Sequence, residues 1–384
     1  MDNGRAADRW NRRIRPRTRR CKADVTMPGT GASALEPWRN WYESRGKRKL
    51  VHSAALAANA HNTQPWRFHV AQDKISVCAD TDRHIGSFDP FRREMHLSLG
   101  CALENIDQAA RAQGLETHME FPPGTLSLAA APSDPAAIVH LRPGNTDESE
   151  LFRAIPRRHT HRGAYDAHRE VPDEVLAGLG AAAADCHMLR LYLVTGAAMK
   201  PLASLITSST RAIIDDPDMS RDNARWFRFR QKAIDECRDG LTLDTNVTKP
   251  LKRFFAKLFP PSAARADRHW GKDTTRIHLA TAPLLGMIAV RSLYDRPTSL
   301  HAGRLWQRLH LLLTARDLAA QPLNQPVERV DRERQLEQPA HTAEALARIT
   351  GDPEWQPTFI FRAGYPLRAP LASPRRPIDA VISR

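Results

Sequence analysis

The sequence lacks any run of about 18 uncharged apolar residues, the least that a membrane-spanning helix needs. Its best candidate is "LATAPLLGMIAV" (279–290), which is too short to cross a bilayer. Charged segments bound this stretch and a proline lies near its start, so we expect a buried strand there. The sequence therefore predicts no membrane partner.

Paired cysteines are also lacking. The five cysteines are odd in number, lie far apart and form no C-x-x-C pair. A disulfide scaffold and a zinc ribbon are both poorly supported. The simplest setting is a reduced compartment, so we expect a cytoplasmic protein.

Several familiar catalytic signatures are missing. There is no G-x-x-x-x-G-K-[ST], no G-x-S-x-G and no H-E-x-x-H, and the G-x-G at Gly29 does not follow an expected strand. Nucleoside triphosphate hydrolysis and serine hydrolysis therefore have no support.

Basic residues are plentiful: the net charge is +14. Residues 1–24 hold nine Arg or Lys and three Asp or Glu, a net of +6. No aromatic residues interleave at helical spacing and no apolar segment follows, so we expect a disordered basic tail and linker over 1–36, with Met27 a possible alternative start. The remaining charge is mild and suits a solvated surface or an anionic ligand site. Nucleic acid is not an expected partner.

Two helices and four strands are expected before residue 148. Leu50, Ala54 and Ala57 share one face of a helix over 47–60, and a core helix over 95–115 closes near Gly114. The stretches "WRFHV", "KISVCAD", "THMEF" and "AIVHLR" alternate as strands do, and the first two suggest a hairpin.

A second series of elements starts near residue 149. It contains a helix over 171–185 with Val175, Leu176 and Leu179 inward. We then expect a strand over 189–194, a helical insertion or lid over about 197–272, a strand near 284, a helix over 301–320, a polar loop over 321–330, a strand over 358–365 and a basic Pro-rich tail.

One stretch of the first series is similar to one stretch of the second. "ALAANAHNTQPWRFHV" and "GAAAADCHMLRLYLV" each give a helix ending in small residues, a short connector and an alternating strand. The second connector, "DCHML", lacks the amides, the proline and the tryptophan of "HNTQPW". This similarity predicts a repeat, although such short similarities also arise by chance.

"HNTQPW" itself allows two interpretations. Asn62 and Gln64 each offer a hydrogen-bond donor and an acceptor, Pro65 fixes the turn, and Trp66 supplies a flat apolar surface. A planar ligand with donors and acceptors along its edge would match this loop. The alternative is an amide-capped turn with a core tryptophan.

"PRRHTHRGAYDAH" (156–168) is the densest group of polar side chains. A metal site could be proposed on its histidines, yet the surrounding arginines would repel a cation. Guanidinium groups suit phosphate, with a solvated surface as the alternative. "SPRRP" (373–377) offers two more guanidinium groups, or a solvated tail.

Together these stretches carry a resemblance. "ALAANAHNTQPWRF" resembles the helix-to-strand signature N-x-Q-P-W-x-F of the nitroreductase family of FMN-dependent oxidoreductases. "RHTHR" resembles the phosphate-binding R-R-S-x-R segment of that family, with His159 in place of the second arginine and Thr160 in place of serine. "FRAGYP" followed by "SPRRP" is similar to the C-terminal turn and basic contact of the family. The order of these parts, with "WFRFRQKAIDECRDGLTLD" and "LNQPVE", resembles the Acg-like branch, in which one chain imitates the usual homodimer.

The resemblance implies an α+β fold of two fused halves, 37–148 and 149–384, each with a mixed or antiparallel sheet flanked by helices. The first half keeps "HNTQPW" and the second keeps "RRHTHR", so one FMN site is expected between the halves of a monomer that acts as an internal pseudo-dimer. The implied activity is reduction of nitro compounds, quinones or a related acceptor by NAD(P)H. The alternative is a flavin-binding or storage protein with a lidded site and little turnover.

The resemblance also implies roles for particular residues. No catalytic side chain and no metal are expected, because the flavin carries the redox chemistry. The implied cofactor contacts are Arg158, His159, Thr160 and Arg162 at the phosphate and ribityl end, Arg375 and Arg376 closing on it, Asn62 and Gln64 facing polar atoms of the flavin, Pro65 and Trp66 shaping the loop, and Asn324 and Gln325 near the ring.

Overall fold

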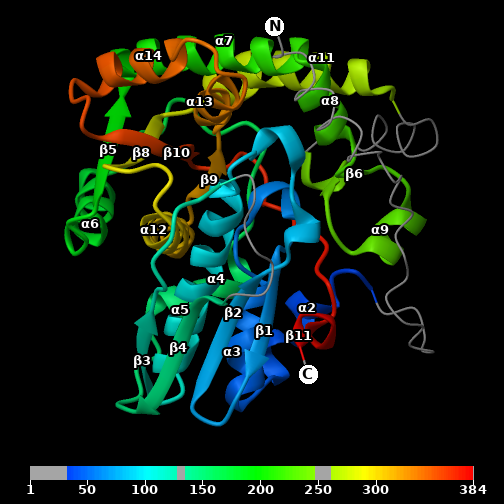
Figure 1. The fold of residues 1–384 in the computed structure, drawn as a ribbon, viewed down its shortest axis with the longest axis vertical. Coiled ribbons are helices and arrows are strands. Elements are labelled where there is room, and N and C mark those ends of the chain that lie inside the picture. Colours follow the sequence, from blue (N-terminus) through cyan, green and yellow to red (C-terminus); the bar gives the residue numbers. More distant parts are fainter. Residues whose placement is uncertain (1–32, 128–134, 247–260, 384) are drawn as a thin grey trace, which may run out of the picture. The chain divides into compact units, whose positions relative to one another are not determined.

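The first sheet contains the hairpin that the sequence predicts. The computed structural model describes residues 33–127, 135–246 and 261–383, which belong to one compact unit (Figure 1). Strand order in this sheet is β11-β1-β2-β4-β3, and Phe68 lies opposite Val77 across the hairpin. Its strands are β1 (Trp66–Val70), β2 (Lys74–Ala79), β3 (Leu115–Glu120), β4 (Pro135–Pro143) and the C-terminal β11 (Ile382–Ser383).

The second sheet has the order β5-β8-β10-β9, and every neighbouring pair is antiparallel. Every residue of β8 is buried, as expected for the apolar stretch there. Its strands are β5 (Leu189–Thr195), β8 (Leu284–Val290), β9 (Ala319–Pro322) and β10 (Gln356–Gly364).

The two sheets share one topology. When β1, β2, β4 and β3 are matched with β5, β8, β10 and β9, the strand order and the antiparallel pairing are the same. A short helix precedes the first strand of each set, and a long helix joins the second strand to the next one along the chain. The α+β architecture of two fused halves and the predicted repeat of the helix-strand unit are therefore confirmed. These helices are α3 (Gly46–Ala55) and α4 (Arg93–Arg111) in the first half, and α6 (Asp173–Ala184) and α12 (Arg296–Ala315) in the second.

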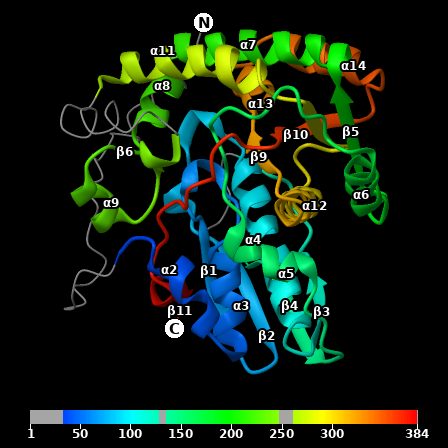
Figure 2. The same ribbon diagram turned by 180° about the vertical axis from the view of Figure 1, so that it is seen from behind.

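The long helices α4 and α12 pack against each other between the sheets (Figures 1 and 2). In α4, every residue from Arg93 to Ala110 is buried, so this helix lies in the core. The predicted helix over 301–320 is corrected at both ends, because α12 begins at Arg296 and gives way to β9 at Ala319. Among the described residues, no helix combines the length and the apolarity that crossing a membrane requires.

The predicted polar loop over 321–330 is wrong. Its first residues belong to β9, and α13 (Gln325–Gln335) starts directly after Asn324. Pro326 lies in the first turn, where its missing N–H costs nothing and its fixed φ suits a helix. The polar composition suggested a loop because it hides the buried face of α13, which contains Val327 and Val330.

The described parts of the segment 197–272, residues 197–246 and 261–272, are largely helical, as expected. Its first helix, α7, contacts α13 and α14, and the pair α7 and α11 lies with α14 along one side of the second sheet in both views (Figures 1 and 2). The chain then enters a π-helix, Thr274–Leu279, before β8. The helices are α7 (Lys200–Asp215), α8 (Pro217–Ala224), α9 (Gln231–Cys237) and α11 (Ala263–Asp273), with α14 (His341–Thr350) beyond the segment.

Both ends of the chain correct the sequence-based expectation of solvated tails. Residues 1–32 lie outside the described part, but Ala34, within the predicted disordered linker, is buried, and its carbonyl accepts from the N–H of Arg375 at 2.8 Å. The C-terminal stretch around Arg375 is buried as well. It leads into β11, which pairs in parallel with β1, so the end of the second half completes the sheet of the first.

Candidate functional site

The "HNTQPW" loop joins α3 to β1 in a strained conformation. Three of its residues, His61, Asn62 and Gln64, have positive φ values of 48°, 53° and 52°. Each such non-glycine residue costs about 1–3 kcal/mol and persists only where its surroundings hold it. The hydrogen bonds that hold these residues are therefore described first.

The side chain of Asn62 is fully hydrogen-bonded. Its Nδ2 donates to the carbonyl oxygens of Gly240 at 3.1 Å and Pro374 at 2.9 Å. Its Oδ1 accepts from Nη1 of Arg375 at 2.5 Å. One amide thus ties the loop to the insertion and to the C-terminal stretch, and its predicted contact with a ligand stays a prediction.

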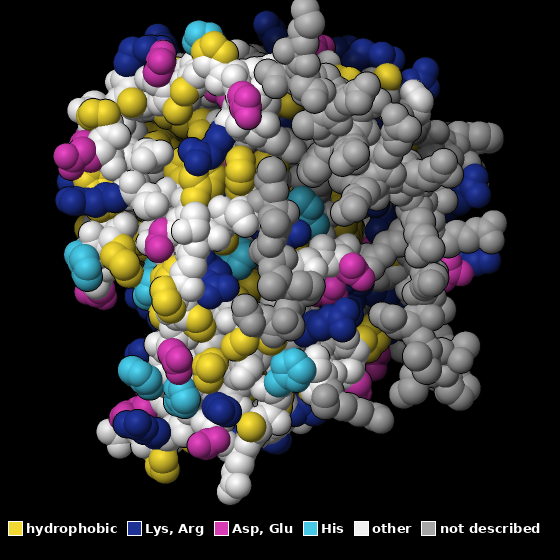
Figure 3. Space-filling model, viewed as in Figure 1, with side chains coloured by type: hydrophobic (Ala, Val, Ile, Leu, Met, Phe, Trp, Pro, Cys, Tyr) yellow, Lys and Arg dark blue, Asp and Glu magenta, His cyan; other side chains and the backbone are white. Residues whose placement is uncertain are grey.

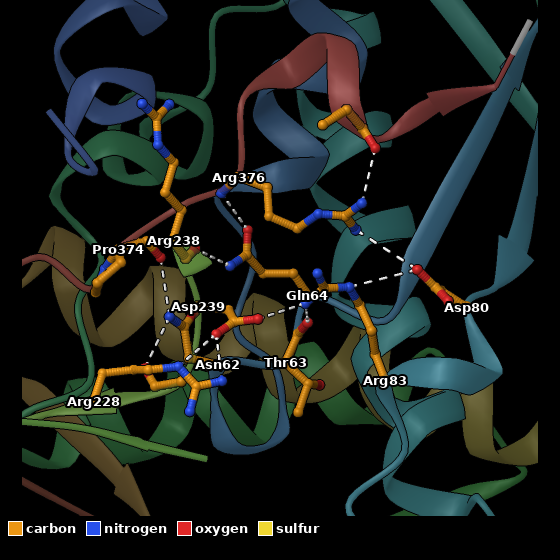
Figure 4. Close-up of polar contacts among 12 residues, drawn as sticks. Asn62, Thr63, Gln64, Asp80, Arg83, Arg228, Arg238, Asp239, Pro374 and Arg376 are labelled. Atoms are coloured by element: carbon orange, nitrogen blue, oxygen red, sulfur yellow. Dashed lines mark hydrogen bonds and ion pairs between the residues drawn. The ribbon is translucent and has the colours of Figure 1, made fainter. Parts of the chain in front are cut away.

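Gln64 makes the same two connections. Its Nε2 donates to the carbonyl oxygen of Arg238 at 2.8 Å, and its Oε1 accepts from the backbone N–H of Arg376 at 2.8 Å (Figure 4). Gln64 has no exposed surface. Both amides therefore act first as clamps between segments that are far apart in the sequence.

Pro65 and Trp66 fix the start of β1. The carbonyl oxygen of Pro65 accepts from the N–H of Asp80 at 2.9 Å, which extends the hairpin by one bond. Trp66 is completely buried and packs near Phe68, and its Nε1 has no hydrogen-bond partner among the described residues. The predicted role of these two residues at a cofactor stays a prediction.

Two buried arginines meet beside this loop. Nη2 of Arg158 and Nη2 of Arg375 donate to the same carbonyl oxygen, that of Leu56, at 3.1 and 3.4 Å. The side chains come from "RRHTHR" and "SPRRP", and neither forms an ion pair with any residue that the structure describes. The Nε atom of each is buried without a partner. Two uncompensated positive charges thus lie together inside the protein.

An aromatic and imidazole frame surrounds the two guanidinium groups. Trp38 lies 4.8 Å from Arg375 and 4.5 Å from the His159 ring, and its Nε1 donates to the carbonyl oxygen of Ser373 at 2.8 Å. His310 of α12 lies on the other side, where Nη1 of Arg158 donates to its Nδ1 at 3.4 Å. Trp38 and His310 were not predicted. His310 stands in a buried helix segment, and a lone histidine there gives no signal of its partner.

The charge state of this cluster follows from burial. Burial, aided by the charges of Arg158 and Arg375, lowers the pKa of His159 to about 3, so this imidazole is neutral at pH 7. Burial lowers the pKa of Arg158 to about 10, and burial together with Arg158 lowers that of Arg375. A guanidinium group stays protonated in proteins, so both groups keep their charge at neutral pH, and neither has an anionic partner among the described residues. A phosphate monoester, with about two negative charges, would balance them and accept from the unpaired Nε atoms.

The other predicted site residues make no described hydrogen bond to the side chains of Arg158 and Arg375. Thr160 forms a bridge with Ala320 of β9, and Arg162 is half-buried near the same strand. The side chain of Arg376 is directed to Asp80, with its Nη1 3.8 Å from Oδ2 of that residue (Figure 4). No described contact joins Asn324 or Gln325 to the residues above.

The part of the insertion that contains α8, α9 and β7 (Leu241–Thr242) covers the loop. Nη1 of Arg83 lies 2.8 Å from Oδ2 of Asp239, and Ser87 donates to Oδ2 of Asp222 at 2.9 Å through both its N–H and its hydroxyl (Figure 4 shows the first pair). The N–H of Gly240 also donates to the carbonyl oxygen of Asn62 at 3.1 Å. The insertion is therefore seated on the face of the predicted cofactor loop.

The histidines of "RRHTHRGAYDAH" do not converge. His168 is exposed, and Arg157 points outward to Asp317 at 2.8 Å. Over the described ranges, no group of three or more His, Cys, Asp and Glu side chains is arranged to hold a metal ion. Within this stretch, Arg158 and His159 lie beside the loop, and His161 is buried with both ring nitrogens unpaired among the described residues.

Comparison with known proteins adds the family context. No family model matches the chain. Two curated proteins, from the CDC 1551 and H37Rv strains of Mycobacterium tuberculosis, carry the provisional name NAD(P)H nitroreductase; each is 26% identical over 366 residues, covering 93% of this chain and 96% of the relative.

Solved structures give weaker likenesses. The FMN-dependent nitroreductase NfnB from Mycobacterium smegmatis, in complex with NADPH, is 16% identical with a TM-score of 0.35, covering 58% of this chain and 94% of that chain. A nitroreductase with bound FMN from Bacteroides fragilis is 14% identical with a TM-score of 0.36, covering 59% and 92%. These TM-scores are too low to support an argument. The chain is thus similar over nearly its full length to two curated proteins that carry a nitroreductase name.

Proposed function

We propose that this protein is an FMN-dependent oxidoreductase in which NAD(P)H reduces a nitro compound, a quinone or a related acceptor. The proposal includes one FMN site per chain, assembled between the two halves. The observation that carries it is the shared contact of Arg158 and Arg375 at the carbonyl of Leu56, beside the "HNTQPW" loop.

The residues present fit the phosphate end of FMN. Arg158 and Arg375 are buried donors without an anionic partner, and the neutral His159 lies beside them with an unpaired Nδ1. Thr160 and Arg162 follow in the same stretch of the chain. These residues would hold the phosphate and ribityl chain, and bound FMN would supply the two-electron redox chemistry.

The loop residues would act by position. Asn62 orients Arg375 through their 2.5 Å hydrogen bond, and Gln64 holds the backbone of Arg376. The strained loop is thereby pre-organised against the second half before any ligand arrives. Such pre-organisation reduces the entropy lost on binding.

The absorption spectrum of the purified protein tests the proposal. We expect a flavin spectrum, or its appearance after FMN is added. Protein that is colourless and stays so with FMN present would refute the function.

A second function, flavin binding or storage with little turnover, is favoured by one observation. The insertion contacts the loop through Asn62, Gln64 and the Arg83–Asp239 ion pair, and so covers a face that nicotinamide would need. Stopped-flow bleaching of the bound flavin by NADH or NADPH separates the two. Reduction faster than that of free FMN supports the enzyme, and slower reduction supports the storage protein.

The remaining expectations concern setting and partners. We propose a cytoplasmic monomer that acts as an internal pseudo-dimer, with NAD(P)H and a small-molecule acceptor as its partners. On the face shown in Figure 3, basic and acidic side chains are intermixed rather than gathered into a basic stripe. This gives no support to nucleic-acid binding on that face.

A further inference from the structure

A second buried polar cluster lies where the start of α4 enters the second half. It contains four carboxyl groups and one guanidinium group, all at most 7% exposed. The α4 side contributes Asp89, Arg93 and Glu94, and α13 contributes Glu328 and Asp331.

One carboxylate neutralises the one cation. Nε and Nη2 of Arg93 donate to Oδ2 of Asp331 at 3.0 and 2.8 Å, and Tyr294 donates to Oδ1 of Asp331 at 3.0 Å. Asp89 accepts from the N–H groups of Glu94 and Met95 at 3.0 and 2.9 Å, where it caps α4. Glu94 and Glu328 are left without a counter-ion.

The neighbours of Glu94 fix its orientation. Oδ1 of Asn324 accepts from the N–H of Ile360 at 3.0 Å, so the Nδ2 of Asn324 is turned to Glu94 and donates to its Oε1. Glu328 lies one turn along α13 from Asn324, and its Oε2 is buried with no partner. An unpaired carboxylate oxygen in the interior is costly unless it carries a proton.

The electrostatics agree with a bound proton. Burial raises the pKa of Glu94 to about 8, and burial together with the charge of Glu94 raises that of Glu328 further above its ordinary range. The other charges acting on Glu328 are Arg93, which opposes the rise, and Asp89 and Asp331, which add to it. The two raised pKa values belong to the interacting pair, so at neutral pH the pair holds on to a proton that two separate carboxyl groups would have lost.

The start of α4, which carries Glu94, is linked to the "HNTQPW" loop through Ser98. The hydroxyl of Ser98, one turn after Glu94, donates to the Glu94 carbonyl at 2.7 Å and accepts from the N–H of Ala60 at 3.0 Å. Ala60 directly precedes "HNTQPW". At the equivalent start of α12, the residue that matches Glu94 is Pro297, so the second helix start has no such carboxyl group.

We propose that Glu94 and Glu328 share one proton at neutral pH and that this pair is the internal acid for the reduction of the acceptor, an inference that rests on the proposed function. Reduction of a quinone adds a hydride, which originates on NAD(P)H, and one proton. The carboxyl O–H bond of the pair breaks, the second O–H bond of the hydroquinone forms, and water re-protonates the carboxylate. The active site then needs no proton from bulk solvent at the moment of transfer.

Glu328→Gln tests the proposal, because it keeps the shape and removes the acid. The control is Glu333→Gln on the same helix, where Thr342 donates to both carboxylate oxygens at 3.1 and 2.6 Å. In the protein without FMN at pH 7, infrared difference spectroscopy should show a protonated carboxyl band in the wild type and in Glu333→Gln that is lost in Glu328→Gln. If Glu328→Gln folds poorly, Glu94→Gln should lose the same band.

A second readout uses quinone reduction by the FMN-loaded protein. Glu328→Gln should lower the rate on the order of 10²-fold, the usual size of a general-acid contribution. The wild-type rate should fall as the pH rises and the pair loses its proton, and Glu328→Gln should not show this fall. A band that persists in both variants would overturn the shared proton, and an unchanged rate with the band lost would overturn the acid role. A wild type that shows the band but binds no FMN would overturn the proposed function and the acid role, while leaving the shared proton supported.

Discussion

Gly100 of α4 and Gly303 of α12 face each other where the two central helices cross. A Cβ atom on Gly100 would lie 2.1 Å from the carbonyl oxygen of Leu300, and one on Gly303 would lie 2.0 Å from that of Leu97. Each glycine thus meets the residue three positions before the other. Such a reciprocal contact is the pattern of a two-fold interface, here within one chain.

Gly100→Ala should therefore destabilise the protein. The added methyl group would meet backbone rather than a flexible side chain, so the helices must separate, at a cost of about 1–3 kcal/mol or more. Gly178→Ala in α6 is the matched control, since nothing lies within 4 Å of its added Cβ, and it should stabilise by about 0.5–1 kcal/mol. Urea denaturation measures both. Equal effects of the two substitutions would contradict the close crossing.

Much of the fold could be predicted because local patterns determine it. Strands such as β1 and β2 alternate, and α4 has apolar residues such as Leu99 and Leu103 at helical spacing. The helix α13 was missed because its polar residues pair with distant ones, as Asp331 does with Arg93. No local pattern encodes such a partner.

The candidate site shows the same limit. The motifs around Asn62, Arg158 and Arg375 could be read from the sequence, because each contains unusual residues in a short stretch. The clamping role of Asn62 could not, since its partners Gly240 and Pro374 are 178 and 312 residues away. Likewise, burial of "SPRRP" depends on Trp38, which no spacing rule connects to it.

Arg158→Ala and Arg375→Ala should each weaken FMN binding about 10- to 100-fold, because a charge-assisted hydrogen bond contributes about 1.5–3 kcal/mol. Arg157→Ala is the control, since this neighbour is exposed and pairs with Asp317. Isothermal titration calorimetry with FMN gives the affinities. An Arg157→Ala protein that loses as much affinity as Arg158→Ala would place the phosphate elsewhere.

Replacing Asn62 and Gln64 together with alanine should weaken FMN binding and also free the insertion, because both amides hold it. We expect faster limited proteolysis within residues 226–246 and a retained fold by circular dichroism. Alanine at Cys186 and His187, in the second connector "DCHML", should change neither FMN binding nor the rate of proteolysis. Identical behaviour of the two double variants would refute a single FMN site that uses the "HNTQPW" loop and not the "DCHML" connector.

Stability should rise with pH from about 4 to 6.5 and then fall. Burial lowers the pKa of His52, His61 and His161 to about 4, so between about 4 and the ordinary value of about 6.5 the unfolded chain binds more protons. The raised pKa of Glu94 acts in the opposite direction between about 4.5 and 8, where the folded chain binds the extra proton. The three histidines outweigh it up to about 6.5, and above that pH stability falls towards pH 8. Urea midpoints across this range test the curve. A rise in stability from pH 6.5 to 8 would exclude the buried acid.

The central claim is that each chain has one FMN site, formed by the "HNTQPW" loop of the first half and the "RRHTHR" segment of the second. The stoichiometry of FMN binding tests this claim most directly. Titration of the purified protein, followed by quenching of flavin fluorescence, should saturate at one FMN per chain, because only one pairing of an intact loop with an intact arginine segment exists. Two FMN per chain, or no binding at all, would contradict the account.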